Sequence, residues 1–199
     1  MSTRIYLEGG GDSKELHARC REGFRRLLER CGFRGRMPRL VACGSRGATF
    51  QDFATAHAVI GRNHYVAMLI DSEDPVADIE RPWAHLKNRD GWDQPPDADD
   101  DQVLLMTTCM ETWIVSDRQT LRDHYGACLQ ESALPSLIDL ESRARRAVQD
   151  ALVRATRNCR RVYGKGAVSF EILGKLAPSV LRASLPSFVR SERILGSKL

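Results

Sequence analysis

The chain has 199 residues, 42% of them hydrophobic, and a formal net charge of +4. That length is enough for one self-sufficient core, so folding requires neither a disulfide framework nor a structural metal. The N-terminus lacks the pattern of a signal peptide, and no apolar run approaches the roughly 20 residues of a membrane span. We therefore expect a cytoplasmic protein that makes no membrane contact.

The cysteines do not form a recognisable metal or disulfide pattern. They contain no CxxC pair and lie inside periodic segments, which is typical of buried thiols in a reducing compartment. We expect free core thiols, not disulfides or zinc ligands. The six are Cys20, Cys31, Cys43, Cys109, Cys128 and Cys159.

Charge is distributed unevenly along the chain. Residues 141–199 contain 13 Lys or Arg against 4 Asp or Glu, a surplus of +9 that leaves the first 140 residues at −5. This division allows carboxylates that bind a metal in one part and contact with a polyanion in the other. On charge alone, a helix with a solvated basic face is the simpler explanation of the second part.

Strand-like and helical patterns alternate through the first 117 residues. Strands are predicted at residues 4–7, 39–43, 65–71 and 102–115. A first helix is predicted up to residue 31, with Asp12 and Glu15 at capping-box spacing, and a second at 50–60. A short helix and a loop are expected between the third and fourth strands.

This alternation predicts an α/β fold with a small, mostly parallel four-stranded sheet flanked by helices. The remaining sequence is helical in pattern, with segments at 118–126, 140–159 and 170–176 and a final short one. We predict a core of residues 1–117 and a helical C-terminal extension of residues 118–199 that packs on it.

Acidic residues follow three of the four predicted strands. The carboxyl ends of parallel strands meet at one edge of the sheet, where ligands bind. Carboxylates that meet there raise one another's pKa unless a cation lies among them, and oxygen ligands favour Mg²⁺ or Mn²⁺. The residues at the strand ends are Glu8, then Ser45 and Arg46, then Asp71, Glu73 and Asp74, and finally Glu111.

Three consecutive glycines, Gly9, Gly10 and Gly11, follow the first strand. They do not continue into the GK[ST] of a nucleotide P-loop, nor do they give the G-x-G-x-x-G of a dinucleotide site. They let the backbone approach a phosphate held by the metal, although a tight turn from strand to helix explains them equally well. Arg46 has two explanations of similar weight, a phosphate clamp or an ordinary surface arginine.

The segments "YLEGGGD" and "LIDSED" resemble the Toprim domain, and longer segments such as "PWAHLKNRDGWDQP" and "VYGKGAVSFEIL" resemble the DUF4276 family over almost the whole chain. The Toprim resemblance implies a glutamate after the first strand and an Asp-x-Asp after the third, which together bind Mg²⁺. By position these are Glu8 and Asp71, with the second ligand left open between Glu73 and Asp74. Nuclease-type relatives imply a further acid and a lysine, matched by Glu111 and Lys165.

The resemblance also implies a partner and a role in defence, because members of the family often occur beside a P-loop ATPase in phage-defence gene clusters. We therefore expect a Toprim-like nuclease dependent on Mg²⁺ or Mn²⁺, with DNA or RNA as substrate and a P-loop ATPase as partner. In this hypothesis Lys165 or Arg46 stabilises the transition state. Basic side chains would contact phosphates without reading sequence. They are Arg143, Arg145, Arg146, Arg154, Arg157, Arg160 and Arg161.

Two alternatives remain open at this point. The first alternative to the nuclease is a regulatory subunit that docks on an ATPase and senses nucleic acid without cutting it. The second, which the sequence favours less, is a nucleotidyl-transfer or ligase-like enzyme that uses the same metal. A nuclease assay with variants of Glu8 and Asp71 separates them.

Overall fold

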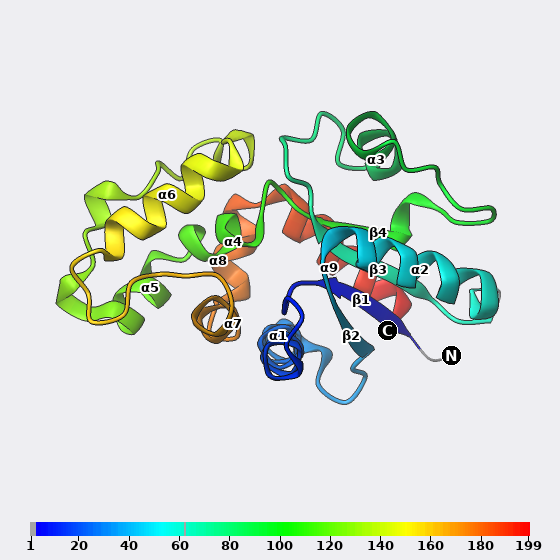
Figure 1. The fold of residues 1–199 in the computed structure, drawn as a ribbon, viewed down its shortest axis with the longest axis horizontal. Helices are drawn as coiled ribbons and strands as arrows, with labels where there is room; N and C mark the ends of the chain where they lie inside the picture. The colour runs from blue at the N-terminus through cyan, green and yellow to red at the C-terminus, as the bar shows by residue number, and fades with distance from the viewer. Residues whose placement is uncertain (1–2, 62) are drawn as a thin grey trace.

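A computed structural model describes residues 3–61 and 63–199, and its centre is a parallel β-sheet (Figure 1). The strands lie in the order β2-β1-β3-β4, and all three pairings are parallel. This confirms the predicted α/β class and the four-stranded parallel sheet. The strands are β1 (Arg4–Glu8), β2 (Arg39–Gly44), β3 (Val66–Asp71) and β4 (Val103–Met106).

Helices cover both faces of this sheet, which is why β3 is buried along its whole length. Alternate side chains of a strand point to opposite faces, so Met68 packs with Phe53 and Trp83 while Leu69 packs with Phe24 on the other side. The first face is covered by α2 (Arg46–Ile60) and α3 (Pro82–Asp90), and the second by α1 (Lys14–Leu28) and α9 (Pro186–Lys198).

The first two helices are each capped by a serine that follows a strand and its turn. Ser13 accepts a hydrogen bond from the backbone N–H of Leu16 at 3.3 Å, so the cap predicted at Asp12 was wrong by one residue. Ser45 caps α2 in the same way through Ala48 at 3.2 Å, and α2 therefore begins four residues earlier than predicted. The first helix continues as the π-helix η1 (Glu29–Phe33).

The fourth predicted strand, at residues 102–115, was wrong in its second half. The strand ends at Met106, and the chain turns into α4 (Met110–Ser116). Every residue of α4 is buried, so the segment has no solvent-exposed face to mark it as helical. A short apolar run of this kind does not distinguish a buried strand from a buried helix.

The helices after β4 form a lobe beside the sheet (Figure 1). The predicted helix at 140–159 is shorter in the structure, because η5 precedes it and it ends at Thr156. The helices of the lobe are α4, α5 (Arg118–Tyr125), α6 (Arg145–Thr156), α7 (Ala167–Leu173) and α8 (Pro178–Ser184). The short 3₁₀ turns are η2 (Asp100–Gln102), η3 (Gly126–Cys128), η4 (Glu131–Ala133) and η5 (Leu140–Ser142).

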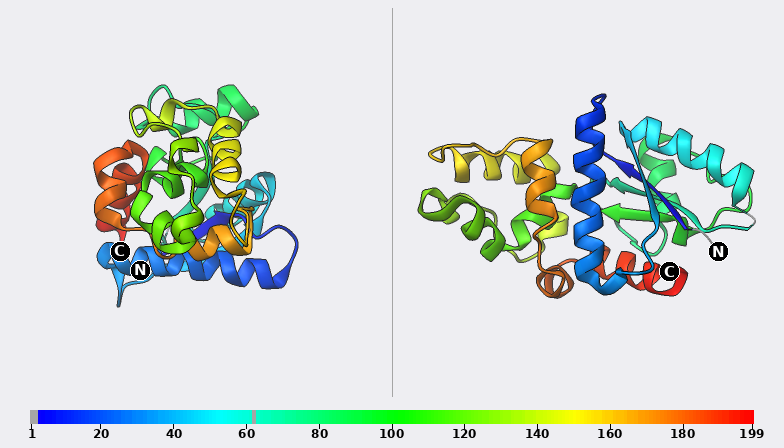
Figure 2. Two further views of the ribbon diagram at one scale, coloured as in Figure 1. Left: turned by 90° about the vertical axis from the view of Figure 1, so that its left-hand side faces the viewer. Right: turned by 90° about the horizontal axis from the view of Figure 1, so that it is seen from below.

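Contacts between α1 and α7 join the lobe to the sheet, and the two helices lie side by side (Figure 2). They approach so closely at Gly23 that a Cβ there would lie 2.6 Å from the carbonyl oxygen of Phe170. The last helix, α9, returns to the sheet, where Arg190 Nη1 donates to the Val103 carbonyl at 2.9 Å. The division of the chain into residues 1–117 and 118–199 stays a prediction.

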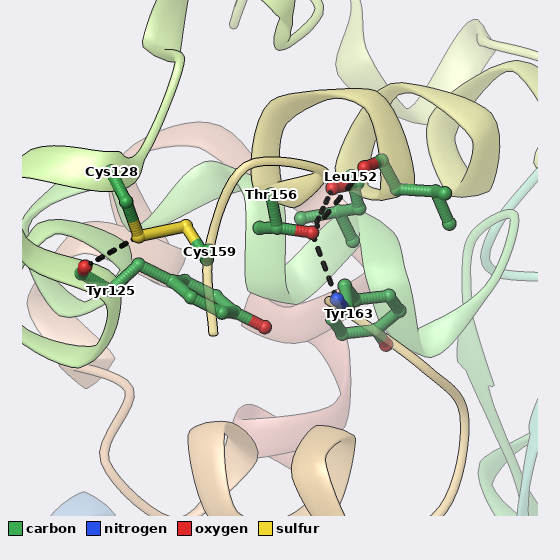
Figure 3. Close-up of a disulfide and its surroundings, with 7 residues drawn as sticks. Tyr125, Cys128, Leu152, Thr156, Cys159 and Tyr163 are labelled. Carbon is green, nitrogen blue, oxygen red and sulfur yellow. Dashed lines mark hydrogen bonds between the residues drawn. A yellow bond between two sulfur atoms is a disulfide. The ribbon is translucent and has the colours of Figure 1, made fainter. Parts of the chain in front are cut away.

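One disulfide ties the lobe together, and the expectation of free thiols was wrong for this pair. Cys128 and Cys159 are joined across a sequence separation of 31 residues (Figure 3). They lie at the ends of separate segments, so their spacing carried no signal of pairing. The other four cysteines are free thiols.

Among the helices of the described residues, none has both the length and the apolar character that crossing a bilayer requires.

Candidate metal centre

Three carboxylates meet at the carboxyl ends of β1 and β3. Glu8 is the last residue of β1, Asp71 is the last of β3, and Glu73 follows two residues later. One oxygen from each lies within 4.8 Å of the others. The strand-end argument therefore brings together three acids that are up to 65 positions apart in the sequence.

Glu73 reaches this cluster through an unusual backbone conformation. Its φ is 70°, in the left-handed region. Its backbone N–H donates to the carbonyl of Thr108 at 2.8 Å, which ties the turn to the loop after β4. A left-handed conformation is costly for a residue with a side chain, and such positions cluster at functional sites.

Asp71 is a buried acid without enough positive charge around it. Only 5% of the residue is exposed, and its Oδ1 accepts a hydrogen bond from the Met110 N–H at 2.8 Å. Burial, followed by the charges of Glu8 and Glu111, raises the pKa of Asp71 to about 8. Burial also raises the pKa of Glu8, whose Oε2 accepts from the Asp71 N–H at 3.0 Å.

These surroundings fit a hard divalent cation. Three carboxylates converge, the donor atoms are all oxygen, and burial raises the pKa values of Glu8 and Asp71, so their ionised forms are disfavoured without a cation. Mg²⁺ and Mn²⁺ prefer such oxygen ligands. The cluster is therefore a candidate metal site, and the identity of the metal as Mg²⁺ or Mn²⁺ stays a prediction.

A cavity of about 320 Å³ opens beside the carboxylates. Seven of the ten predicted site residues line it, and the remainder of its wall is largely apolar, with Leu16, Met106, Met110 and Phe170. The predicted residues that line it are Glu8, Gly9, Gly10, Gly11, Asp71, Glu111 and Lys165. Glu73, Asp74 and Arg46 are not among the lining residues.

The glycine loop forms a tight turn and also lines the cavity. Gly9, Gly10 and Gly11 all have positive φ, at 128°, 93° and 51°. A Cβ on Gly10 would lie 2.6 Å from Cδ2 of His17. Gly9 exchanges backbone hydrogen bonds with Gly44 at 2.9 and 3.1 Å. The tight turn and the lining of the cavity are therefore both features of this loop, and contact with a phosphate stays a prediction.

Glu111 is completely buried, and the protein supplies partners for it. Tyr163 donates its hydroxyl to Oε1 at 3.0 Å, and Gln149 Nε2 donates to Oε2 at 3.2 Å. Lys165 Nζ lies 3.9 Å from the same Oε2. Burial and the charge of Glu111 raise the pKa of Tyr163 well above its ordinary value.

Sequence analysis did not identify Tyr163 or Gln149. They lie 52 and 38 positions from Glu111, and nothing local connects them to it. Tyr163 stands two residues before Lys165 in "VYGKG", which is the one local signal that points to it.

Arg46 lies next to the acids but is already engaged. Its side chain is 12% exposed, its Nη1 donates to the backbone carbonyl of Asp71, and its Nη2 lies 2.7 Å from Asp90. It also lies 3.8 Å from Glu8 and 5.0 Å above the ring of Trp92. Its role as a phosphate clamp stays a prediction.

Two further arginines approach the site from different helices. Arg89 of α3 lies 3.7 Å from Glu73 and 2.9 Å from Asp74, and Arg145 of α6 forms an ion pair with Glu73. Asp74 itself is mostly exposed. Arg89 and Asp90 were not identified from the sequence, whereas Arg145 was expected only as one of a basic group.

Comparison with known proteins gives one match. The model of a family described as a domain of unknown function, DUF4276, matches residues 7–193. No curated protein and no solved structure matches the chain. The matched region begins within β1 and ends within α9, so it includes the carboxylates, the glycine loop and the helical lobe. On this match, the chain belongs to the DUF4276 family.

Proposed function

We propose that this chain is a nuclease that depends on Mg²⁺ or Mn²⁺ and cleaves phosphodiester bonds of DNA or RNA. The observation that carries the proposal is the convergence of Glu8, Asp71 and Glu73, whose oxygens lie within 4.8 Å of one another beside a cavity. The likeness of "YLEGGGD" and "LIDSED" to the Toprim domain supports the same chemistry.

Each residue has a defined part in this proposal. Glu8, Asp71 and Glu73 hold the cation, and Asp74 is next to Glu73 in the sequence. When bound, the cation supplies a Lewis acid that lowers the pKa of a water molecule and neutralises charge on a phosphate. Lys165, whose Nζ lies 3.9 Å from Glu111, places a positive charge in the same cavity, where it favours an anionic substrate.

The basic surface of the lobe supplies affinity for the backbone of the nucleic acid. Arg157, Arg160 and Arg161 are exposed and follow α6, in the segment that leads to Lys165. Contacts of this kind release counterions and do not read sequence. The P-loop ATPase partner and the defence role rest on the family resemblance alone.

A second function, sensing of nucleic acid without cleavage, is favoured by one observation. Glu73 is already paired with two arginines, so part of the carboxylate charge is balanced without a metal. In that case the basic lobe binds nucleic acid while the acidic cluster has only a structural part.

The test is a cleavage assay with Mn²⁺ on single-stranded and duplex DNA and RNA. We expect Glu8→Gln and Asp71→Asn to abolish cleavage and leave binding of nucleic acid intact. Glu131→Gln, which removes an exposed carboxylate paired with Arg122 in the lobe, is the matched control and should cleave normally. Binding without cleavage by every form, with and without an ATPase partner, would support the sensor.

A further inference from the structure

Two arginines from separate elements converge on one carboxylate. Arg89 reaches Glu73 from α3 on the sheet side, and Arg145 reaches the same carboxylate from the first turn of α6 in the lobe. The three residues are distant in sequence, so this contact exists only in the folded chain. The ion pairs of Glu73 therefore connect the sheet to the helical lobe.

The two arginines differ in how well they are satisfied. Arg89 keeps two other partners, Asp74 at 2.9 Å and the adjacent Asp90, whereas Glu73 is the one carboxylate paired with Arg145 within the described residues. The Nε of Arg145 is buried and has no hydrogen-bond partner in that same part of the chain. A buried donor without a partner is costly, so Arg145 retains capacity for another acceptor.

Arg145 also acts on the rest of the site. Its charge lowers the pKa of Glu8, against the effect of burial, so its guanidinium lies within electrostatic reach of the carboxylate cluster. About a third of each arginine side chain is exposed, at 30% for Arg89 and 31% for Arg145. Both side chains are therefore partly accessible from solvent.

A cation held by the cluster competes with these arginines for Glu73. A carboxylate that ligates a divalent ion has less charge to offer a guanidinium, and Arg145 then loses its ion-pair partner. The planar guanidinium matches the geometry of a phosphate group and binds it through paired N–H donors.

We propose that Arg89 and Arg145 form an anion clamp that holds Glu73 before metal binding and holds a phosphate of the substrate after it. The proposal rests on the metal-dependent function above and extends it to the residues that position the substrate. It assigns the larger share to Arg145, since Arg89 remains paired with Asp74 and Asp90 in either state. Neither arginine is assigned to the chemical step.

The test uses the full chain and two titrations. The first follows Mn²⁺ alone by electron paramagnetic resonance of the free ion, and the second follows inorganic phosphate by calorimetry at saturating Mg²⁺. The variants are Arg145→Gln and Arg89→Gln, with Arg122→Gln as the matched control, because Arg122 pairs with Glu131 at 2.7 Å in the same lobe. Thermal unfolding of each variant checks that it is folded.

The expected signature is a pair of opposite effects. Arg145→Gln should bind Mn²⁺ more tightly, by about fivefold, because a competing cation has been removed. It should bind phosphate more weakly, by about tenfold, because a charged donor has been lost. Arg89→Gln should show both effects at smaller size, and Arg122→Gln should show neither.

Other results overturn the clamp in distinguishable ways. If the unaltered protein binds Mn²⁺ but Arg145→Gln matches the control in both titrations, the ion pair is only structural and the clamp alone is refuted. Weaker Mn²⁺ binding by Arg145→Gln would mean that the arginine orients Glu73 as a ligand and does not compete with the metal. Absence of Mn²⁺ binding by the unaltered protein removes the metal centre and the clamp together.

Discussion

The sheet edge and the helical lobe each contribute a buried acid to the same cavity, and the two acids are treated differently. Asp71, at the end of β3, lies beside Glu8 and has a pKa raised to about 8. Glu111, at the start of α4, has donors from Tyr163 and Gln149 and lies 3.9 Å from Lys165. At the sheet edge, Asp71 thus has no ion-pair partner among the described residues, whereas the lobe supplies Glu111 with hydrogen-bond donors and a nearby lysine.

This difference indicates that the two acids have different roles. A carboxylate with unbalanced charge is suited to bind a cation, and one whose oxygens already accept hydrogen bonds is suited to hold another side chain in place. Glu111 was predicted as a metal ligand, but its oxygen is not in the group of three within 4.8 Å. Its contacts in the structure are hydrogen bonds from Tyr163 and Gln149 and an ion pair with Lys165 at 3.9 Å.

The largest expected effect comes from removing the disulfide of the lobe. Replacing both cysteines, Cys128→Ser with Cys159→Ser, should lower the free energy of unfolding by about 3–4 kcal/mol, because the bond closes a loop of 31 residues in the unfolded chain. Urea denaturation measures this. Cys31→Ser, at a free and partly buried thiol, is the control, and an equal loss in both proteins would contradict the prediction.

Next in size is the removal of the unbalanced charge. Asp71→Asn should weaken Mn²⁺ binding by at least about 100-fold, or about 2.7 kcal/mol, and should not destabilise the protein without metal. The reason is that the amide keeps the size of the side chain but has no charge to desolvate. Calorimetric titration and urea denaturation on the same samples give both quantities, and unchanged Mn²⁺ affinity would remove Asp71 from the site.

The balanced charge of the lobe makes the opposite prediction. Tyr163→Phe removes the donor to Glu111 Oε1 and should cost about 1–3 kcal/mol of stability, since a buried carboxylate oxygen is left without a partner. Tyr125→Phe is the matched control, because the buried Tyr125 hydroxyl has no partner among the described residues. The control should be neutral or stabilising, and a similar loss in both variants would show that the contact with Glu111 contributes nothing.

The last prediction is the dependence on pH, whose effect is small for one pH unit and accumulates over several. The pKa of Asp71 rises from 3.8 to about 8 on folding, so the folded chain holds a proton that the unfolded chain has released. Stability from this group is therefore complete below about pH 4 and is lost as pH rises towards 8, by at most about 1.4 kcal/mol per unit. Mn²⁺ affinity should rise over the same interval, since binding displaces the proton.

Unfolding curves at pH 5, 6, 7 and 8 check this sign. The unaltered protein should lose stability relative to Asp71→Asn as pH rises, and saturating Mn²⁺ should reduce that difference. Parallel curves for the two proteins would show that Asp71 ionises in the folded state as easily as in the unfolded chain.

The sequence by itself determined the sheet and its acidic edge. Alternating strand and helix patterns predict a parallel sheet, and Glu8 and Asp71 end two of its strands, so strand direction places both at the same edge. Their contact also requires β1 and β3 to be neighbours, which the fold provides. The same local information failed at residues 110–116, where a helix buried on all sides has no solvent-exposed face.

Only the tertiary structure decided which groups surround each acidic side chain. Glu73 turns towards Asp71 because its backbone is tied to Thr108, and Tyr163, Gln149 and the two arginines reach the site across many intervening residues. The pairing of Cys128 with Cys159 has the same origin. Contacts of this range depend on the paths of loops and on packing between helices, and neither is encoded in the periodicity of a single segment.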